Sequence, residues 1–235
     1  MTVRTTPHHT TSRVVAQTLE TYDRYARLFL ARWGKPRYTR PALLVEWLTL
    51  LPKRAVLLDL GCGGGQDTRY LKAVGHRVIG LDRTLSLLRF GKKRSPFVPL
   101  ILADMRSLPL RTASLDGIWA AASLVHLPKA AAVQVLMELH RLVGPGGVLA
   151  ATVTYGTRSR ILERGWIPGR YFARWKKTEL ASALRSAGWE IVTLKVVTNQ
   201  ERKGRWLNLL ARRPPVESTR CDRMGGKTQV CLSKR

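Results

Sequence analysis

The stretch of this sequence that decides its fold runs Val56-Leu-Leu-Asp59-Leu-Gly61-Cys-Gly63-Gly-Gly65-Gln-Asp67. An apolar run ends in an acidic residue, a glycine-rich turn follows, and a polar stretch begins directly after the turn. A near-continuous apolar run is typical of a strand that is covered on both faces. Glycines are needed where the backbone turns sharply and where a ligand must approach without a Cβ in the way. The stretch therefore predicts a buried strand, a ligand-binding turn and a helix, at the strand end where open parallel sheets bind ligands.

Short apolar runs alternate with amphipathic stretches on both sides of this turn. Strands that alternate with helices imply crossover connections, so we expect an α/β fold with a mostly parallel sheet and helices on both faces. The expected strands are Ala55–Leu60, Arg77–Leu81, Val98–Leu102, Gly117–Ala121, Gly147–Val153, Glu190–Val197 and Arg205–Ala211. The expected helices are Val14–Trp33, Pro41–Leu51, Gln66–Val74, Thr84–Phe90, Lys129–Val143 and Thr178–Ala187.

These patterns divide the chain into three segments. Residues 1–52 form a helical lead-in, and residues 53–212 carry the alternating strands and helices. Residues 213–235 have no apolar period, so we expect a disordered basic tail there. Cys221 and Cys231 lie in this tail without a neighbouring His or Cys, which falls short of a ligand set, so no metal is expected.

The composition excludes several classes of protein. Hydrophobic residues make up 45% of the 235 residues and charged residues 24%, which excludes a wholly disordered chain. The longest uncharged, apolar-leaning stretch, Gly117–Pro128, is too short to cross a bilayer, and Met1–Thr11 lacks the apolar segment of a secretory signal. Three cysteines are too few for a disulfide scaffold. We therefore expect a cytoplasmic protein without a membrane span.

The net charge of +26 raises the question of a nucleic-acid partner. The excess of basic over acidic residues lies between +5 and +8 in each of the segments 1–52, 53–153, 154–211 and 212–235, with no concentrated block. A generally basic solvated surface explains such a spread without a specific partner. Nucleic acid therefore stays an alternative that the charge alone does not favour.

Two acidic residues define the ligand expected at the glycine turn. Asp82 follows the next strand, where a carboxylate can accept hydrogen bonds from both hydroxyls of a ribose, so the ligand contains a nucleoside. Asp59 lies at the strand end, where it would repel the pyrophosphate of a dinucleotide but attract the ammonium and sulfonium groups of S-adenosylmethionine (SAM). The carboxylate of SAM can bind N–H groups at the following helix start. These charges favour SAM over NAD.

Five motifs in order give the chain its resemblance to a known family. They are Asp59-Leu-Gly-Cys-Gly-Gly-Gly65, Val78-Ile-Gly-Leu-Asp82, Ala103-Asp104-Met105, Leu115-Asp-Gly-Ile-Trp-Ala-Ala-Ala122 and Leu142-Val-Gly-Pro-Gly-Gly-Val148. In this order and spacing they resemble the class I SAM-dependent methyltransferases, particularly the ubiquinone/menaquinone-type (type 11) bacterial group. The resemblance covers residues 18–212.

The resemblance implies a fold and a set of cofactor-binding residues. The family has a Rossmann-like sheet of seven strands in the order 3-2-1-4-5-7-6, with the seventh antiparallel, and an N-terminal helical lid. Trp206–Arg212 resembles that last strand. The residues that would bind SAM are Asp59, Gly61, Cys62, Gly63, Gly64, Asp82, Arg83, Asp104, Met105 and Ala121. Cys62 would contribute backbone contacts, since a catalytic cysteine would also need a base beside it.

His126 is the candidate catalytic residue. It follows the fourth expected strand in a loop that should face the acceptor cleft, and a histidine suits proton removal near neutral pH. A base is needed only if the methyl acceptor keeps its proton. The competing interpretation is a loop histidine that shapes the pocket or binds backbone, and the family motifs do not decide between them.

The acceptor pocket should be roofed by residues 155–177, in which aromatic residues alternate with arginines. Aromatic walls with guanidinium groups suit a planar or acidic acceptor, and equally a nucleobase flanked by phosphates. An amphipathic cover with solvated arginines would have the same pattern. The expected acceptor-binding residues are Trp166, Arg170 and Tyr171 in this roof, and Tyr22 and Tyr25, which resemble an aromatic signature of the lid helix.

The leading hypothesis is an enzyme that transfers the methyl group of SAM to a small-molecule acceptor by in-line displacement. Methylation of tRNA or rRNA through the basic surface is the first alternative, and a SAM-binding module without catalysis is the second. Asp59 and the Asp104 motif argue against a NAD-dependent oxidoreductase. No obligate protein partner is evident from the sequence.

Overall fold

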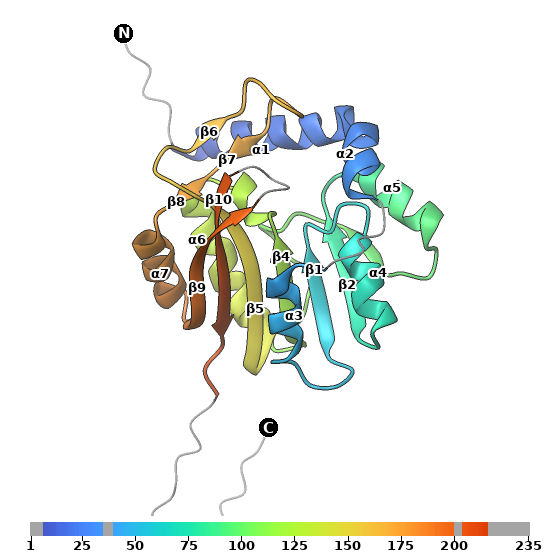
Figure 1. The fold of residues 1–235 in the computed structure, drawn as a ribbon, viewed down its shortest axis with the longest axis vertical. Helices are drawn as coiled ribbons and strands as arrows, with labels where there is room; N and C mark the ends of the chain where they lie inside the picture. Colours follow the sequence, from blue (N-terminus) through green and yellow to red (C-terminus); the bar gives the residue numbers. More distant parts are fainter. Residues whose placement is uncertain (1–6, 35–39, 200–203, 216–235) are drawn as a thin grey trace, which may run out of the picture.

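The structure is a computed structural model that describes residues 7–34, 40–199 and 204–215. Most of the expected tail, from residue 216 on, lies outside the described residues, so the tail and the division of the chain at residues 52 and 212 stay predictions. The described part forms a central sheet with helices on both faces and one helix, α1, across an end of the sheet (Figure 1).

The sheet has the strand order β3-β2-β1-β4-β5-β10-β9, which confirms the expected order. All neighbours from β3 to β5 are parallel, whereas β10 is antiparallel to both β5 and β9. The strands are β1 (Val56–Leu60), β2 (Arg77–Asp82), β3 (Leu100–Leu102), β4 (Leu115–Ala121), β5 (Val143–Tyr155), β9 (Glu190–Asn199) and β10 (Gly204–Arg212). The helices are α1 (Pro7–Arg24), α2 (Ala26–Trp33), α3 (Ala42–Leu48), α4 (Gln66–Ala73), α5 (Leu85–Arg94), the 3₁₀ turn η1 (Leu124–His126), α6 (Lys129–Leu142) and α7 (Lys177–Ser186).

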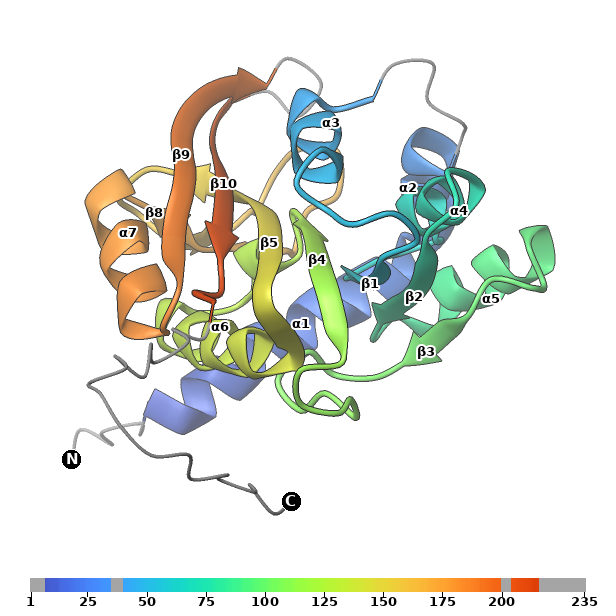
Figure 2. The same ribbon diagram turned by 90° about the horizontal axis from the view of Figure 1, so that it is seen from below.

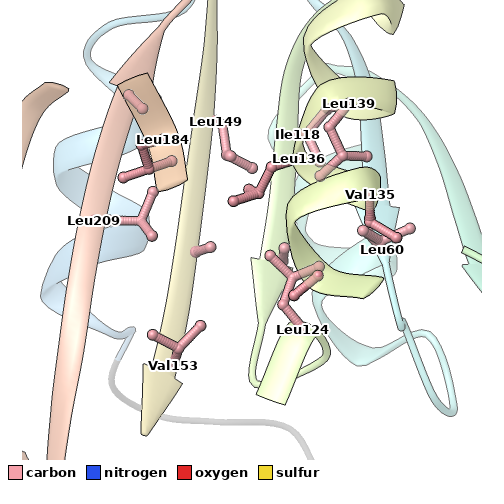
Figure 3. Packing of buried hydrophobic residues seen from close by; sticks show 14 of the residues in the cluster. Leu60, Ile118, Leu124, Val135, Leu136, Leu139, Leu149, Val153, Leu184 and Leu209 are labelled. Atoms are coloured by element: carbon pink, nitrogen blue, oxygen red, sulfur yellow. The ribbon is translucent and has the colours of Figure 1, made fainter. Parts of the chain in front are cut away.

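Successive residues of the central strands point to opposite faces, and each face has its own apolar core. On one face Leu58 and Leu60 pack with α6 and α7 in the larger cluster, part of which is drawn in Figure 3. On the other face Leu57 packs with Trp47 of α3 and Leu71 of α4, and Figure 2 shows α3 and α4 on this side. The sequence Val56–Leu60 is apolar almost throughout because both of its faces are covered.

Register brings the carboxyl ends of the central strands together. Asp59 pairs with Gly80 of β2 and with Trp119 of β4, so the residues that follow these strands meet at one edge of the sheet. This edge lies under α1, which confirms the helical lid. Helix α3 belongs to the expected lead-in but covers a face of the sheet, where the Trp47 indole donates a hydrogen bond of 3.0 Å to the carbonyl of Val148.

The lead-in differs from the expected helix Val14–Trp33. The helix breaks at Tyr25, whose φ of −103° and ψ of 20° are not helical, and α2 starts at the next residue. The break turns α2 away from α1, so that Ala26 and Leu30 are buried against Leu87 of α5. Apolar spacing alone does not reveal such a break, because both helices keep a buried stripe.

The roof segment also contains short strands that the sequence does not predict. β6 (Arg160–Ile161) pairs with β7 (Tyr171–Phe172), and β8 (Arg174–Trp175) extends the end of β5. Two-residue strands are too short to show an alternating pattern. The third strand is likewise shorter than expected because Pro99 has no N–H for the ladder, although its carbonyl accepts a hydrogen bond from Gly80.

Candidate active site

The glycine turn after β1 depends on a backbone conformation that side chains disfavour. Gly61 has a φ of +72°, and a Cβ at this position would lie 2.3 Å from the Cβ of Ser123, which follows β4. The turn is therefore held close to the neighbouring loop, and its N–H groups are fixed. One of them, that of Gly63, donates a hydrogen bond of 2.8 Å to Oδ2 of Asp82.

Asp82 is fixed by backbone on both sides of its carboxylate. Oδ2 accepts from Gly63 and Oδ1 accepts from the N–H of Thr84 at 2.8 Å. Burial raises the pKa of Asp82 despite these hydrogen bonds. Each carboxylate oxygen has a further lone pair, so the side chain can still accept from a ligand in the cavity.

Asp59 is only 3% exposed at the end of β1. Burial and the negative charge of Asp67 raise the pKa of Asp59 to about 8, although the hydroxyl of Thr68 donates a hydrogen bond of 2.6 Å to Oδ2. Asp67 itself accepts from the indole of Trp119 at 2.9 Å. The raised pKa means that Asp59 ionises readily near neutral pH only when a cation compensates the second negative charge, so the pair favours a cationic ligand.

Several polar atoms near this pair are buried without a partner among the described residues. They include Nε2 of Gln66, Oδ1 of Asp67 and Oγ of Ser123. All three residues line the same cavity as Asp59. A buried polar atom without a hydrogen bond is costly, so these atoms fit a ligand that carries both donors and acceptors.

Asp104, in the turn after β3, forms ion pairs with two arginines. Arg83 forms an ion pair with Oδ2, and Arg106 donates to the same oxygen at 2.7 Å. Burial raises the pKa of Asp104, but the hydrogen bonds and charges of the two arginines outweigh burial and lower it. This arrangement fixes Asp104, and of the two arginines Arg83 lines the cavity.

Cys62 has the properties of a structural thiol. Burial, followed by the negative charges of Asp59 and Asp82, raises the pKa of its thiol well above the usual value. A thiol under these conditions stays protonated, which argues against a nucleophilic cysteine.

A cavity of about 540 Å³ joins the glycine turn to the lid and the roof. All ten residues predicted to bind the cofactor line it, as do Tyr22, His126, Trp166 and Arg170. Tyr25 and Tyr171 are not among the lining residues. Arg164, Phe172 and Arg174 of the expected roof also line it. The sequence prediction missed further lining residues, which include Phe29, Arg32, Trp33, Gln66, Asp67, Ser123 and Arg205. Of these, only Asp67 has a recognisable signal, an acid in the first turn of a helix.

His126 connects the lid to the roof. Its Nε2 lies 2.8 Å from the hydroxyl of Tyr22 on α1, and its Nδ1 lies 2.7 Å from the carbonyl oxygen of Tyr171 on β7. The imidazole also meets the ring of Phe172 edge to face, with the centroids 4.8 Å apart. Tyr171 therefore reaches the site through its backbone, and its N–H donates to the hydroxyl of Thr18.

Arg170 is buried in the roof, with 9% of its surface exposed. Its Nε donates to the carbonyl of Ile167 at 3.0 Å, and Nη1 lies 3.3 Å from the hydroxyl of Tyr22. The guanidinium lies over the rings of Tyr22, Trp166 and Phe172 at 5.2–5.5 Å from their centroids. None of the ion pairs within the described residues includes Arg170.

The described ranges contain neither a metal-binding cluster nor a membrane-spanning helix. No group of three or more His, Cys, Asp or Glu side chains is placed to hold a metal ion there. No helix in the same part of the chain is long and apolar enough to cross a membrane.

Comparisons with known proteins agree with this geometry. Residues 58–151 match the family described as a methyltransferase domain (Methyltransf_11). A malonyl-[acyl-carrier protein] O-methyltransferase of Pseudescherichia vulneris is 31% identical over 183 residues, which are 74% of this chain and 68% of that protein. A trans-aconitate 2-methyltransferase of Azoarcus sp. (strain BH72) is 35% identical over 143 residues, 59% of this chain and 55% of that protein.

A solved structure extends the similarity of the fold beyond the matched family residues. The 1,6-didemethyltoxoflavin-N1-methyltransferase of Burkholderia thailandensis, with bound 1,6-didemethyltoxoflavin and S-adenosylhomocysteine, has a TM-score of 0.69 and 23% identity. The similarity covers 91% of this chain and 93% of that protein. The chain therefore belongs to the class I SAM-dependent methyltransferases of the type 11 kind, and SAM is its cofactor.

Proposed function

We propose that this enzyme transfers the methyl group of SAM to a small acceptor that carries a negative charge. The cavity has two chemically different halves, and the proposal assigns one to each reactant. The carboxylates of Asp59, Asp67 and Asp82 surround the glycine turn, whereas the roof contributes arginines and aromatic rings.

The carboxylate half fits SAM. Asp59 and Asp67 would hold its cationic methionine end, and the unpartnered polar atoms of Gln66 and Ser123 lie beside them. Asp82 would accept from the ribose hydroxyls through the lone pairs that Gly63 and Thr84 leave available. The neighbourhood of Asp104 and Met105 would receive the adenine. When bound, SAM supplies a methyl group that its sulfonium has already activated.

The contribution of the chain to the reaction is then mainly alignment. The walls of the cavity hold the acceptor atom in line with the methyl group, and such orientation can supply ~7–11 kcal/mol of the barrier. The lid helix α1 and the roof exclude water from this space, because Tyr22 on α1 meets His126 and Arg170 across it.

The burial of Arg170 is the observation on which the choice of an anionic acceptor rests. A buried guanidinium without a carboxylate partner is costly, so the site is expected to receive an anion. Arg164, Arg174 and Arg205 also line the cavity and add positive charge. The relatives named above for malonyl-[acyl-carrier protein] and trans-aconitate act on compounds with carboxylates, which supports an acidic acceptor here.

The test is transfer of labelled methyl from SAM to two pools, an ultrafiltered small-molecule fraction of a bacterial extract and total RNA. We expect label in anionic small molecules, with a rate that changes weakly with salt. Label in RNA, at a rate that falls steeply with salt, would favour the RNA alternative. Arg170→Gln should slow the transfer about 10- to 100-fold, because this factor corresponds to the loss of a hydrogen bond to a charged group. Arg185→Gln, on the exposed side of α7, is the matched control. No transfer to either pool would contradict catalysis altogether.

A further inference from the structure

The hydrogen bonds of His126 have a defined direction. A carbonyl oxygen can only accept, so the 2.7 Å contact with Tyr171 requires the imidazole proton on Nδ1. In the neutral ring Nε2 is then an acceptor, and the hydroxyl of Tyr22 must donate to it across 2.8 Å. The chain of donors therefore runs from Tyr22 to His126, with the backbone of Tyr171 fixing the tautomer.

This direction determines whether the hydroxyl of Tyr22 donates or accepts a hydrogen bond on the side that faces the acceptor. The proton of the Tyr22 hydroxyl is committed to His126, so toward the cavity the phenol oxygen acts as a hydrogen-bond acceptor. A group that binds to this oxygen from the cavity must bring a proton of its own. A carboxylate oxygen, which brings none, would meet repulsion between lone pairs.

We propose that Tyr22 and His126 form a proton relay, in which Tyr22 is the catalytic residue that touches the acceptor and His126 is the base behind it. This inference rests on the proposed function and deepens it, because it assigns the methyl-accepting atom to an N–H or O–H group. The acidic group of the acceptor would bind Arg170, and a second group that carries a proton would be methylated.

In the acceptor X–H, X is the nitrogen or oxygen that receives the methyl group. The lone pair of X forms the new bond to the methyl carbon while the carbon–sulfur bond breaks, and that electron pair stays on sulfur as S-adenosylhomocysteine leaves. The proton of X passes to the oxygen of Tyr22, whose own proton passes to Nε2 of His126. The imidazolium keeps its Nδ1–H bond to Tyr171 and releases the extra proton to solvent after product release.

Arg170 is placed to assist this transfer. Its Nη1 lies 3.3 Å from the Tyr22 oxygen, where a positive charge stabilises the negative charge that develops while the proton moves. The phenol of Tyr22 on α1 contacts the imidazole of His126, and the guanidinium of Arg170 in the roof contacts that phenol in turn. The proposed relay therefore uses His126 as its base and Arg170 as a cation beside the phenol oxygen.

The first experiment tests the direction of the hydrogen bonds without any acceptor. ¹⁵N NMR of the full-length enzyme reports the protonation of each ring nitrogen, and the signals of His126 are those lost in His126→Gln. We expect the neutral ring to carry its proton on Nδ1, and the Nε2 signal to shift in Tyr22→Phe but not in Tyr70→Phe. A proton on Nε2 in the wild type would overturn the relay.

The second experiment identifies the class of the methylated atom. Label is transferred from SAM to the small-molecule fraction, and the products are treated with mild base, which releases labelled methanol from methyl esters only. We expect label that resists base, as in N-methyl groups and methyl ethers. Base-labile label would show a carboxylate acceptor and overturn the relay while leaving the proposed function intact. No label in any small molecule would contradict the proposed function instead.

The third readout separates proton transfer from packing. Rates of methyl transfer are measured with saturating and with limiting amounts of the small-molecule fraction, over a range of pH. Tyr22→Phe and His126→Gln should each lower the saturated rate about 10²- to 10⁴-fold, with little change in the half-saturating dilution, and should abolish the fall in rate at low pH. Tyr70→Phe should match the wild type. A loss confined to half-saturation, with the pH profile unchanged, would assign Tyr22 and His126 to binding alone.

Discussion

Asp59 and Asp67 line the same cavity, and the charge of Asp67 helps burial to raise the pKa of Asp59 to about 8. The two acids come from the end of β1 and the first turn of α4, on either side of the glycine turn. A cation that binds between them removes the repulsion and favours the ionised form of Asp59. The affinity for SAM is therefore linked to the protonation of this carboxylate.

The affinity of the enzyme for SAM should rise with pH up to about 8 and then level off. Below that value Asp59 carries a proton in the free enzyme, and binding of the cation must release it, which costs up to about tenfold in affinity per pH unit. Calorimetry in buffers with different ionisation enthalpies should detect the released proton. Affinity that does not change between pH 6 and pH 8, without proton release, would contradict this linkage.

The stability of the free enzyme should have the opposite dependence on pH. The pKa of Asp59 lies above its usual value of 3.8, so this side chain favours the folded state most at low pH, and its contribution is lost as pH rises through about 8. Saturating SAM should therefore raise the melting temperature more at pH 9 than at pH 6. Melting curves with and without SAM measure both trends, and equal shifts at the two values would count against them.

Asp67→Asn should move the pH dependence of SAM binding to lower pH. The variant removes the negative charge that contributes, after burial, to the raised pKa of Asp59. It keeps an oxygen that can accept from the Trp119 indole, which limits structural damage. Glu190→Gln, an exposed acid at the start of β9, is the control for a general loss of charge. If the pH dependence of SAM binding were the same in Asp67→Asn as in the wild type, the charge of Asp67 would not contribute to the raised pKa of Asp59.

The fold, and the residues that line the proposed SAM half of the cavity, could be predicted because their signals are local. Asp59 and Asp82 lie at the ends of β1 and β2, and the glycines follow β1, so their places can be derived from the strand ends of a parallel sheet. The acceptor half could not be predicted in the same way. Tyr22 and His126 are 104 residues apart, and Tyr22 and Arg170 are 148 apart, so their contacts arise only when the lid and the roof pack together.

The roles of single aromatic residues also could not be predicted from the sequence. Tyr22 and Tyr25 belong to one motif, but the helix breaks at Tyr25, and of the two only Tyr22 lines the cavity. Tyr171 contributes its carbonyl rather than its ring, which no side-chain pattern can indicate. Packing between distant segments decides these roles.

Gly61→Ala should reduce stability and SAM affinity together. The new Cβ would lie 2.3 Å from the Cβ of Ser123 and would also have to adopt a φ of +72°, which we expect to cost about 1–3 kcal/mol of unfolding free energy. Gly75→Ala is the matched control, because its φ of +98° imposes strain but no atom lies within 4 Å of the new Cβ. Ser123→Gly should relieve part of the loss in the double variant. Equal losses at Gly61 and Gly75, measured by denaturant unfolding, would show that close packing of the turn is unimportant.

Replacement of Asp82 tests the ribose assignment, provided that structural damage is separated from binding. Asp82→Ala leaves the N–H groups of Gly63 and Thr84 without their carboxylate, so both stability and SAM affinity should fall, the affinity by about 10- to 100-fold. A SAM analogue without the two ribose hydroxyls isolates the direct contact. Because it cannot use the carboxylate, this analogue should lose much less affinity than SAM when Asp82 is replaced. Equal losses for the two ligands in calorimetry would mean that Asp82 acts only by shaping the glycine turn, and the ribose would then bind elsewhere in the cavity.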